Sequence, residues 1–296
     1  MGTYPPHTRK TAQERRVLRL RRALRSVINP PDTEYPVPNT TNSIYWVGAG
    51  STNWYDARNW SASSGGDGGY GVPTATNPVV FDGGSDTVGP FLCVLERAVT
   101  CAAISFTEAE ATVATEFSQN GKTITCTTFT YNVPTANSGE VFDGPIYVTH
   151  NTGTFTVTAA ENADHFGSDM TVYATGTGIT VTSAVALAGT FNCAGNFTTG
   201  GALSLGRLIF SSAAAQAIEF LHGVDFTLIA YTEGDWDGAS GAVNTIVSDD
   251  ASTWGFVNPA GMVVAYINVQ DSNATNAIDA TDNCVDGTGN TNWTFV

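Results

Sequence analysis

The sequence predicts an all-β body, and three observations support this prediction. From residue 79 onward, apolar residues alternate with threonine or serine in short runs such as Lys122–Tyr131 and Asp225–Tyr231, the period of a half-buried strand. Few Asn-Gly or Asp-Gly turns join matched runs, although such turns are typical of antiparallel hairpins. Loops between similar runs differ in length, as between the coils of a solenoid. We expect a right-handed parallel β-helix, with a β-sandwich as the alternative.

The six tryptophans flank the central runs of this body. Three lie before residue 61, three lie after residue 235, and none lies between. Wide rings fit poorly inside a narrow coil, whereas a ring over its end seals apolar surface by burial. We expect caps at both ends, formed by Trp46, Trp54, Trp60, Trp254 and Trp293. The alternative is a carbohydrate-stacking surface, to which Trp236 or Tyr231 would contribute.

A basic leader precedes the body and predicts a helix. Thr11-Ala12-Gln13-Glu14 matches a capping box, in which the threonine and glutamate side chains satisfy free N–H groups at a helix start. Apolar residues then recur every three or four positions until Pro30-Pro31, where a helix must end. We expect an amphipathic anchor helix over residues 11–29. Its expected contact residues are Arg15, Arg16, Val17, Arg19, Leu20, Arg22, Leu24, Arg25 and Val27.

The sequence therefore predicts three segments. Residues 1–31 form the basic anchor helix, and residues 32–43 form a proline-rich linker that is expected to be extended. Residues 44–296 form the β-helical body. Within the body, we expect an opening cap over 44–97, coils over 98–232 and a closing region over 233–296.

The net charge of −15 conceals two segments of opposite sign. The leader holds eight basic residues and one acid, a net charge of +7, whereas the remaining chain holds four basic residues and 26 acids, a net charge of −22. Nucleic acid binding through the body is excluded, because phosphate contacts need a basic surface. The leader has three candidate binding partners: a membrane surface, nucleic acid, or a groove on an acidic protein assembly. Packing of the leader helix on the acidic body of its own chain is a special case of the last alternative.

Candidate residues for chemistry are few. Glu161, Asp164, His165 and Asp169 lie in one polar segment, but neighbouring acids on a solvated loop are common. Elimination chemistry needs a base beside a neutralised carboxylate, and none of the body's four cations lies in an acidic cluster along the sequence. Carboxylates that could bind calcium follow no calcium-loop pattern, and we interpret them as turn residues; they are Asp235, Asp237, Asp249, Asp250, Asp279, Asp282 and Asp286. We expect no catalytic residue, no metal and no cofactor.

Two phrases carry a resemblance to a known group. The first is Tyr45-Trp46-Val47-Gly48-Ala49-Gly50 followed by Asn53-Trp54 and Asn59-Trp60, and the second is the closing Asn290-Thr291-Asn292-Trp293-Thr294-Phe295. Together they resemble β-helical structural proteins of tailed bacteriophages and of some bacterial surfaces, over about residues 44–296. The resemblance implies a virion or surface component and brings no catalytic residue. It does not distinguish capsid decoration, collar, tail fibre and spike.

From these observations we expect a non-enzymatic bacteriophage structural protein that is held in the virion by its N-terminal helix. Its expected partners are other virion proteins of the capsid, collar or tail, and further copies of the chain, with a trimer as one arrangement. The alternative function is a receptor-binding fibre or tailspike that binds, or cleaves, a host surface glycan. A bacterial surface adhesin is a third candidate function.

Overall fold

The computed structural model describes residues 42–82, 92–107, 116–133, 142–149, 154–160, 170–174, 178–181, 185–250 and 252–296. All of them belong to one compact unit, Val37–Val296. The predicted anchor helix and its nine contact residues lie outside the described residues, as does the polar segment around His165. Within the described part of the chain the protein is all-β, and its one helical element is the short 3-10 helix η1 (Ala57–Asn59).

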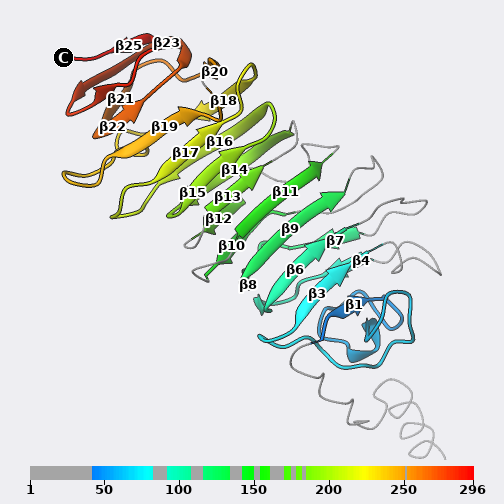
Figure 1. Cartoon of the computed structure of the whole chain (residues 1–296). Helices are drawn as coiled ribbons and strands as arrows, with labels where there is room; N and C mark the ends of the chain where they lie inside the picture. Colours follow the sequence, from blue (N-terminus) through cyan, green and yellow to red (C-terminus); the bar gives the residue numbers. More distant parts are fainter. Residues whose placement is uncertain are drawn as a thin grey trace, which may run out of the picture. The chain divides into compact units, whose positions relative to one another are not determined.

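Two large sheets build the unit (Figure 1). The 12-stranded sheet contains, in spatial order, β2 (Trp60–Ser61), β1 (Ile44–Trp46), β3 (Pro78–Phe81), β6 (Ala103–Phe106), β9 (Thr128–Val133), β11 (Thr154–Ala160), β13 (Gly178–Val181), β15 (Asn196–Thr199), β17 (Ala217–Phe220), β19 (Asn244–Ser248), β22 (Ile267–Val269) and β24 (Val285–Asp286). The 11-stranded sheet contains β21 (Met262–Ala265), β23 (Ser272–Asp282), β20 (Trp254–Val257), β18 (Asp225–Ala230), β16 (Leu203–Phe210), β14 (Val185–Cys193), β12 (Thr171–Ala174), β10 (Pro145–Val148), β8 (Ile124–Cys126) and β5 (Val99–Thr100), with β25 (Thr291–Thr294) paired to β23. A two-stranded sheet joins β4 (Leu92–Val94) to β7 (Glu116–Ser118).

The chain alternates between the two large sheets from β8 to β20, so each strand pairs with the strand two further along. All pairs of described strands are parallel except β1 with β2. Parallel neighbours need a crossover between them, and here the crossover is a strand of the opposite sheet. This arrangement is compatible with a solenoid, and it differs from the antiparallel sheets of an immunoglobulin-like sandwich.

The register places equivalent residues on top of one another. On the inner face of the 12-stranded sheet, successive strands align a column of apolar residues: Val79, Ile104, Phe129, Phe155, Ile179, Phe197, Ile218 and Ile246. Each of them is at most 1% exposed. Their neighbours along the strands face outward, among them Thr130, Thr156, Thr180 and Thr198. The alternation of apolar residues with threonine therefore corresponds to the inner and outer faces of one sheet.

Phenylalanine rings fill the interior. Phe81 stacks on Phe106 at 4.7 Å between ring centroids, and Phe129 stacks on Phe155 at 4.8 Å. Phe142 contacts Phe106 edge to face at 5.2 Å. The interior is thus wide enough for stacked benzene rings, and offset or edge-to-face pairs of this kind add stabilisation beyond area burial.

Replacing Phe106 by alanine is expected to lower the free energy of unfolding by about 3–5 kcal/mol, because it leaves a cavity among buried rings. Ser105→Ala is the matched control, since Ser105 is the next residue on β6 and faces outward; its expected change is below about 0.5 kcal/mol. Urea denaturation measures both variants. Equal unfolding midpoints for the two would contradict the assignment of inner and outer faces.

The five cysteines are all free thiols, and four of them are buried. Burial raises the pKa of both Cys101 and Cys193 to about 12, so neither forms a reactive thiolate at neutral pH. Cys284 is the partly exposed one.

We expect an aromatic disulfide reagent to modify one thiol per chain under native conditions, that of Cys284. The others should react only after denaturation, because reagent and solvent do not reach them. Absorbance of the released thiolate measures the count, and Cys284→Ser serves as the control that removes the native reaction. Rapid modification of several thiols in the folded protein would be inconsistent with this packing.

Candidate functional site

Three of the predicted cap residues lie together at the opening of the body. Trp46 and Trp60 are aligned across the antiparallel pair β1–β2, and Trp54 packs on Trp60 at 4.7 Å between centroids. All three are at most 1% exposed. The Nε1–H of Trp60 donates to the backbone oxygen of Trp54 at 2.6 Å. Below them Phe81 contacts all three rings, which connects the cluster to the aromatic interior.

Asn59 holds the glycine-rich opening loop in place. Its side-chain oxygen accepts the backbone N–H groups of Gly50 and Ser51 at 2.7 and 2.9 Å, and its Nδ2 donates to the backbone oxygen of Asn53 at 2.8 Å. A buried amide that satisfies three backbone groups fixes this loop, whose backbone is also linked through the parallel bridge between Asn53 and Val94. The Asn-Trp pairs of the opening phrase thus combine loop anchorage by the amide with burial of the ring.

The closing region holds the other two predicted cap residues. Trp254 on β20 is fully buried and stacks on Phe220 at 4.3 Å. Trp293 on β25 is only partly buried, and its Nε1 donates to Ser272 Oγ at 3.0 Å. Trp293 also stacks on Phe295 at 6.3 Å, so the last aromatic residues of the sequence continue the stack toward the C-terminus.

Trp236 and Tyr231 are the residues that would contribute to a carbohydrate-stacking surface. Neither presents a fully exposed aromatic ring. Trp236 is fully buried, stacks on Phe256 at 5.0 Å and donates from Nε1 to the backbone oxygen of Leu208. Tyr231 is half-buried, and its hydroxyl donates to the backbone oxygen of Val263. Burial, followed by the charge of Asp237, raises the pKa of Tyr231 to about 12.

Three of the body's four cations, Arg58, Arg97 and Arg207, contact neighbouring side chains. Arg207 donates from Nε and Nη2 to the two carboxylate oxygens of Asp235 at 2.8 and 2.6 Å, and Asp235 is 4% exposed. Along the sequence no body cation lies in an acidic cluster, and the fold brings Arg207 next to Asp235 from 28 positions away. Asp235 also accepts the backbone N–H of Thr232. The pair closes the segment between β18 and β19 onto β16.

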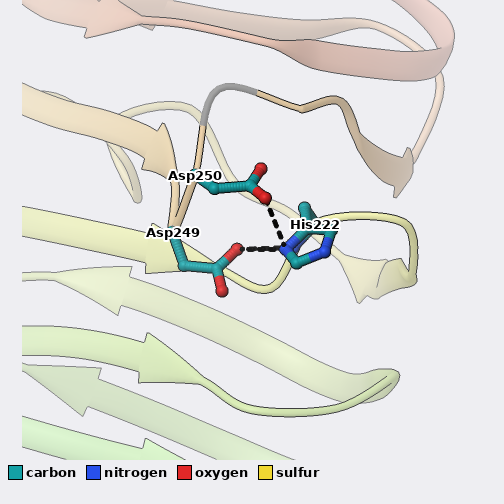
Figure 2. A group of neighbouring side chains, drawn as sticks. All are labelled: His222, Asp249 and Asp250. Carbon is teal, nitrogen blue, oxygen red and sulfur yellow. Dashed lines mark hydrogen bonds and ion pairs between the residues drawn. The ribbon is translucent and has the colours of Figure 1, made fainter.

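A polar cluster of His222, Asp249 and Asp250 lies at the turns between the two sheets. Only its two aspartates were candidates from the sequence. His222, between β17 and β18, faces Asp249 and Asp250, which follow β19 (Figure 2). Nδ1 of His222 lies 3.0 Å from Oδ1 of Asp249 and 3.3 Å from Oδ2 of Asp250. The two aspartates were recognised as adjacent turn carboxylates. His222 was missed because it lies 27 residues away and only the pairing of β17 with β19 brings it close.

These contacts shift the titration of both partners. The hydrogen bond to Asp249, followed by the charge of Asp250, raises the pKa of His222 above 6.5. The backbone N–H of His222 donates to Asp249 Oδ1 at 2.7 Å, and this bond is the largest cause of the lowered pKa of Asp249. The imidazolium of His222 and the carboxylate of Asp249 thus favour each other's charged forms.

Among the described residues, His222, Asp249 and Asp250 form the group whose donor atoms lie close enough to share a metal ion, all within 4.8 Å of one another. The carboxylates of Asp279, Asp282 and Asp286, weighed from the sequence as calcium ligands, do not form such a group in the described structure. Asp279 and Asp286 instead accept backbone N–H groups two residues ahead, as turn-forming aspartates do.

The comparisons add no relative to this description. The chain matches no protein-family model, no curated protein and no solved structure. In the described part of the chain, no helix has the length and apolar character of a membrane span.

We expect the pKa of His222 to lie above 6.5 in the folded protein and to fall toward 6.5 when Asp249 and Asp250 are both changed to asparagine. The stabilisation by His222 is complete below pH 6.5 and is lost as the pH rises through its folded pKa. The stabilisation by Asp249 is complete above pH 3.8 and is lost as the pH falls through its lowered folded pKa. The ion pair of His222 with Asp249 is therefore fully formed between pH 3.8 and pH 6.5.

NMR titration of the imidazole proton resonances measures this pKa directly. The resonance of His222 is assigned as the one missing from His222→Ala. A pKa of His222 unchanged by the double asparagine variant would show that the carboxylates do not act on the ring.

Proposed function

We propose that the protein is a non-enzymatic structural component of a bacteriophage virion, with an acidic β body held in the particle by a basic N-terminal anchor. The observation that carries the proposal is the division of charge, +7 in residues 1–31 against −22 in the rest of the chain. A body of high negative charge remains soluble. The leader combines arginines with an apolar stripe, the composition of a helix that docks into a groove.

The body is proposed to be a right-handed parallel β-helix closed at both ends by tryptophans. Two parallel sheets with alternating strands, and a continuous column of apolar residues between them, support this reading. An open coil exposes apolar interior and unpaired strand edges, which invite aggregation. Trp46, Trp54 and Trp60 cover the first strands, and Trp254 and Trp293 lie on the last strands of the 11-stranded sheet.

The contacts of the body's cations favour a structural over a catalytic role. Arg58 pairs with Asp56 at 2.5 Å and the guanidinium of Arg97 lies 3.6 Å over the ring of Tyr55. Arg207 is held by both oxygens of Asp235. A general base must be free to accept a proton from a substrate, whereas each of these three guanidinium groups is held against a neighbouring side chain.

The anchor is proposed to act through two chemistries at once. Guanidinium groups pair with carboxylates or phosphates through two parallel hydrogen bonds. The apolar residues Val17, Leu20, Leu24 and Val27 bury against the partner. The partner is a capsid, collar or tail protein with an acidic groove, and the proline-rich linker sets the body away from it. Self-association of the body, as a trimer among other arrangements, is part of the same proposal.

The alternative role as a glycan-binding fibre has weaker support, because the ring of Trp236 is buried in the core. It predicts binding of the isolated body to a host glycan array. The anchor proposal makes no such requirement.

Deletion of residues 1–31 is expected to leave a folded body that no longer enters the particle. Virions assembled with the truncated protein should contain it only at background level, measured by quantitative mass spectrometry of purified particles. Circular dichroism of the truncated protein serves as the folding control. Normal occupancy of the truncated body would refute the anchor role.

Two matched variants separate the chemistries of the anchor. One replaces Arg15, Arg16, Arg19, Arg22 and Arg25 by glutamine, which removes charge and keeps helix propensity. The other replaces Val17, Leu20, Leu24 and Val27 by serine. Both should lower occupancy if docking uses a basic, apolar helix, and loss in the glutamine variant alone would favour a purely electrostatic contact.

A further inference from the structure

The turns that carry His222, Asp249 and Asp250 belong to consecutive layers of the stack. β17 pairs with β19 and β18 pairs with β20, so the two turns that connect these strands lie one above the other. Backbone hydrogen bonds join them directly: Asp249 donates to the oxygen of Phe220, and Gly223 donates to that of Thr253, both at 2.9 Å. The backbone positions of the three side chains are therefore set by the sheet register and by these backbone bonds, and the bond from the His222 N–H to Asp249 Oδ1 adds to them.

The three side chains converge on one point from these two turns (Figure 2). In a metal site with bonds of about 2.0–2.1 Å, neighbouring ligand atoms are separated by roughly 3.0–3.4 Å in octahedral or tetrahedral geometry. The distances from His222 Nδ1 to the oxygens of Asp249 and Asp250 are 3.0 and 3.3 Å. Both nitrogen-to-oxygen distances thus match one coordination shell, and the two carboxylate oxygens lie within 4.8 Å of each other.

We propose that His222, Asp249 and Asp250 bind a divalent transition-metal ion of the zinc class and thereby link two consecutive layers of the body. The ion takes the place of the imidazole proton that the two carboxylates now share. Three protein ligands leave positions for water, and the exposure of all three residues makes those positions accessible.

The donor set selects this class of ion. Calcium and magnesium take oxygen ligands, and calcium takes six to eight of them. An imidazole nitrogen with two carboxylates suits zinc and its first-row neighbours instead. The negative charge of two adjacent aspartates also favours a dication over the single positive charge of an imidazolium. Since the ion needs a neutral imidazole, protons compete with it.

The inference is independent of the proposed virion role, because it concerns contacts within the body. The ion would join the β17–β18 turn to the β19–β20 turn without altering the fold. In a stack where each layer touches only its neighbours, such a link resists separation of the two layers. Its effect should appear as a higher melting temperature in the presence of the ion.

Calorimetric titration of the full-length protein with zinc chloride tests the proposal. The wild type should bind one ion that depends on His222, and both His222→Ala and Asp249→Asn should weaken this binding by at least about tenfold. Because zinc binds other histidines, the matched control changes His7, His150 and His165 to alanine together and should retain the site. The melting temperature should rise with zinc in the wild type and in this control, but not in His222→Ala.

Circular dichroism confirms that each variant is folded. Zinc binding that survives in His222→Ala, or that disappears in the control variant, would overturn the proposal, as would a wild type that binds no zinc. In those cases the three residues form an ion pair only. A calcium site that depends on the aspartates but not on His222 would equally overturn the choice of ion.

Discussion

The register of the parallel strands is the constraint on which the rest of this structure depends. Side chains alternate between faces with a period of two, so a slip of one residue would turn every apolar side chain of a strand toward solvent. The column from Val79 to Ile246 keeps this register across consecutive strands. The same pairing sets Arg207 beside Asp235 and His222 beside Asp249, because both contacts join residues about one layer apart. Core, ion pairs and the candidate metal ligands are thus consequences of one alignment.

Much of the fold could be predicted because alternation is a local signal. The runs around Phe129, Phe155 and Phe197 each show in a few residues which face is buried, and the scarcity of hairpin turns favoured parallel pairing. The sequence alone could not give the register between runs, because every run has a similar pattern and the loops differ in length. Arg207–Asp235 and the approach of His222 to Asp249 were missed for this reason. Asp249 and Asp250 were noticed only because they are adjacent in the chain.

The expectation about aromatic residues needed a refinement. Wide rings were expected to be excluded from the coil, and tryptophan is indeed absent between residues 61 and 235. Phenylalanine, however, is stacked along the interior, from Phe81 and Phe106 to Phe226 and Phe256. A benzene ring stacked flat on its neighbour in the next layer fits a spacing of about 4.7–4.9 Å between strands. The indole N–H groups of Trp60, Trp236 and Trp254 donate to backbone oxygens, whereas the buried N–H of Trp46 has no acceptor among the described residues.

The connections between strands differ greatly in length. Thr127 alone separates β8 from β9, whereas residues 134–144 separate β9 from β10. The parallel ladders continue on either side, with a one-residue shift where β9 pairs with β11, since loop-closure entropy grows only slowly with length. The architecture therefore separates what must be conserved for folding from what is free to diverge. New recognition surfaces could arise by lengthening a single connection, without any compensating change in the strands.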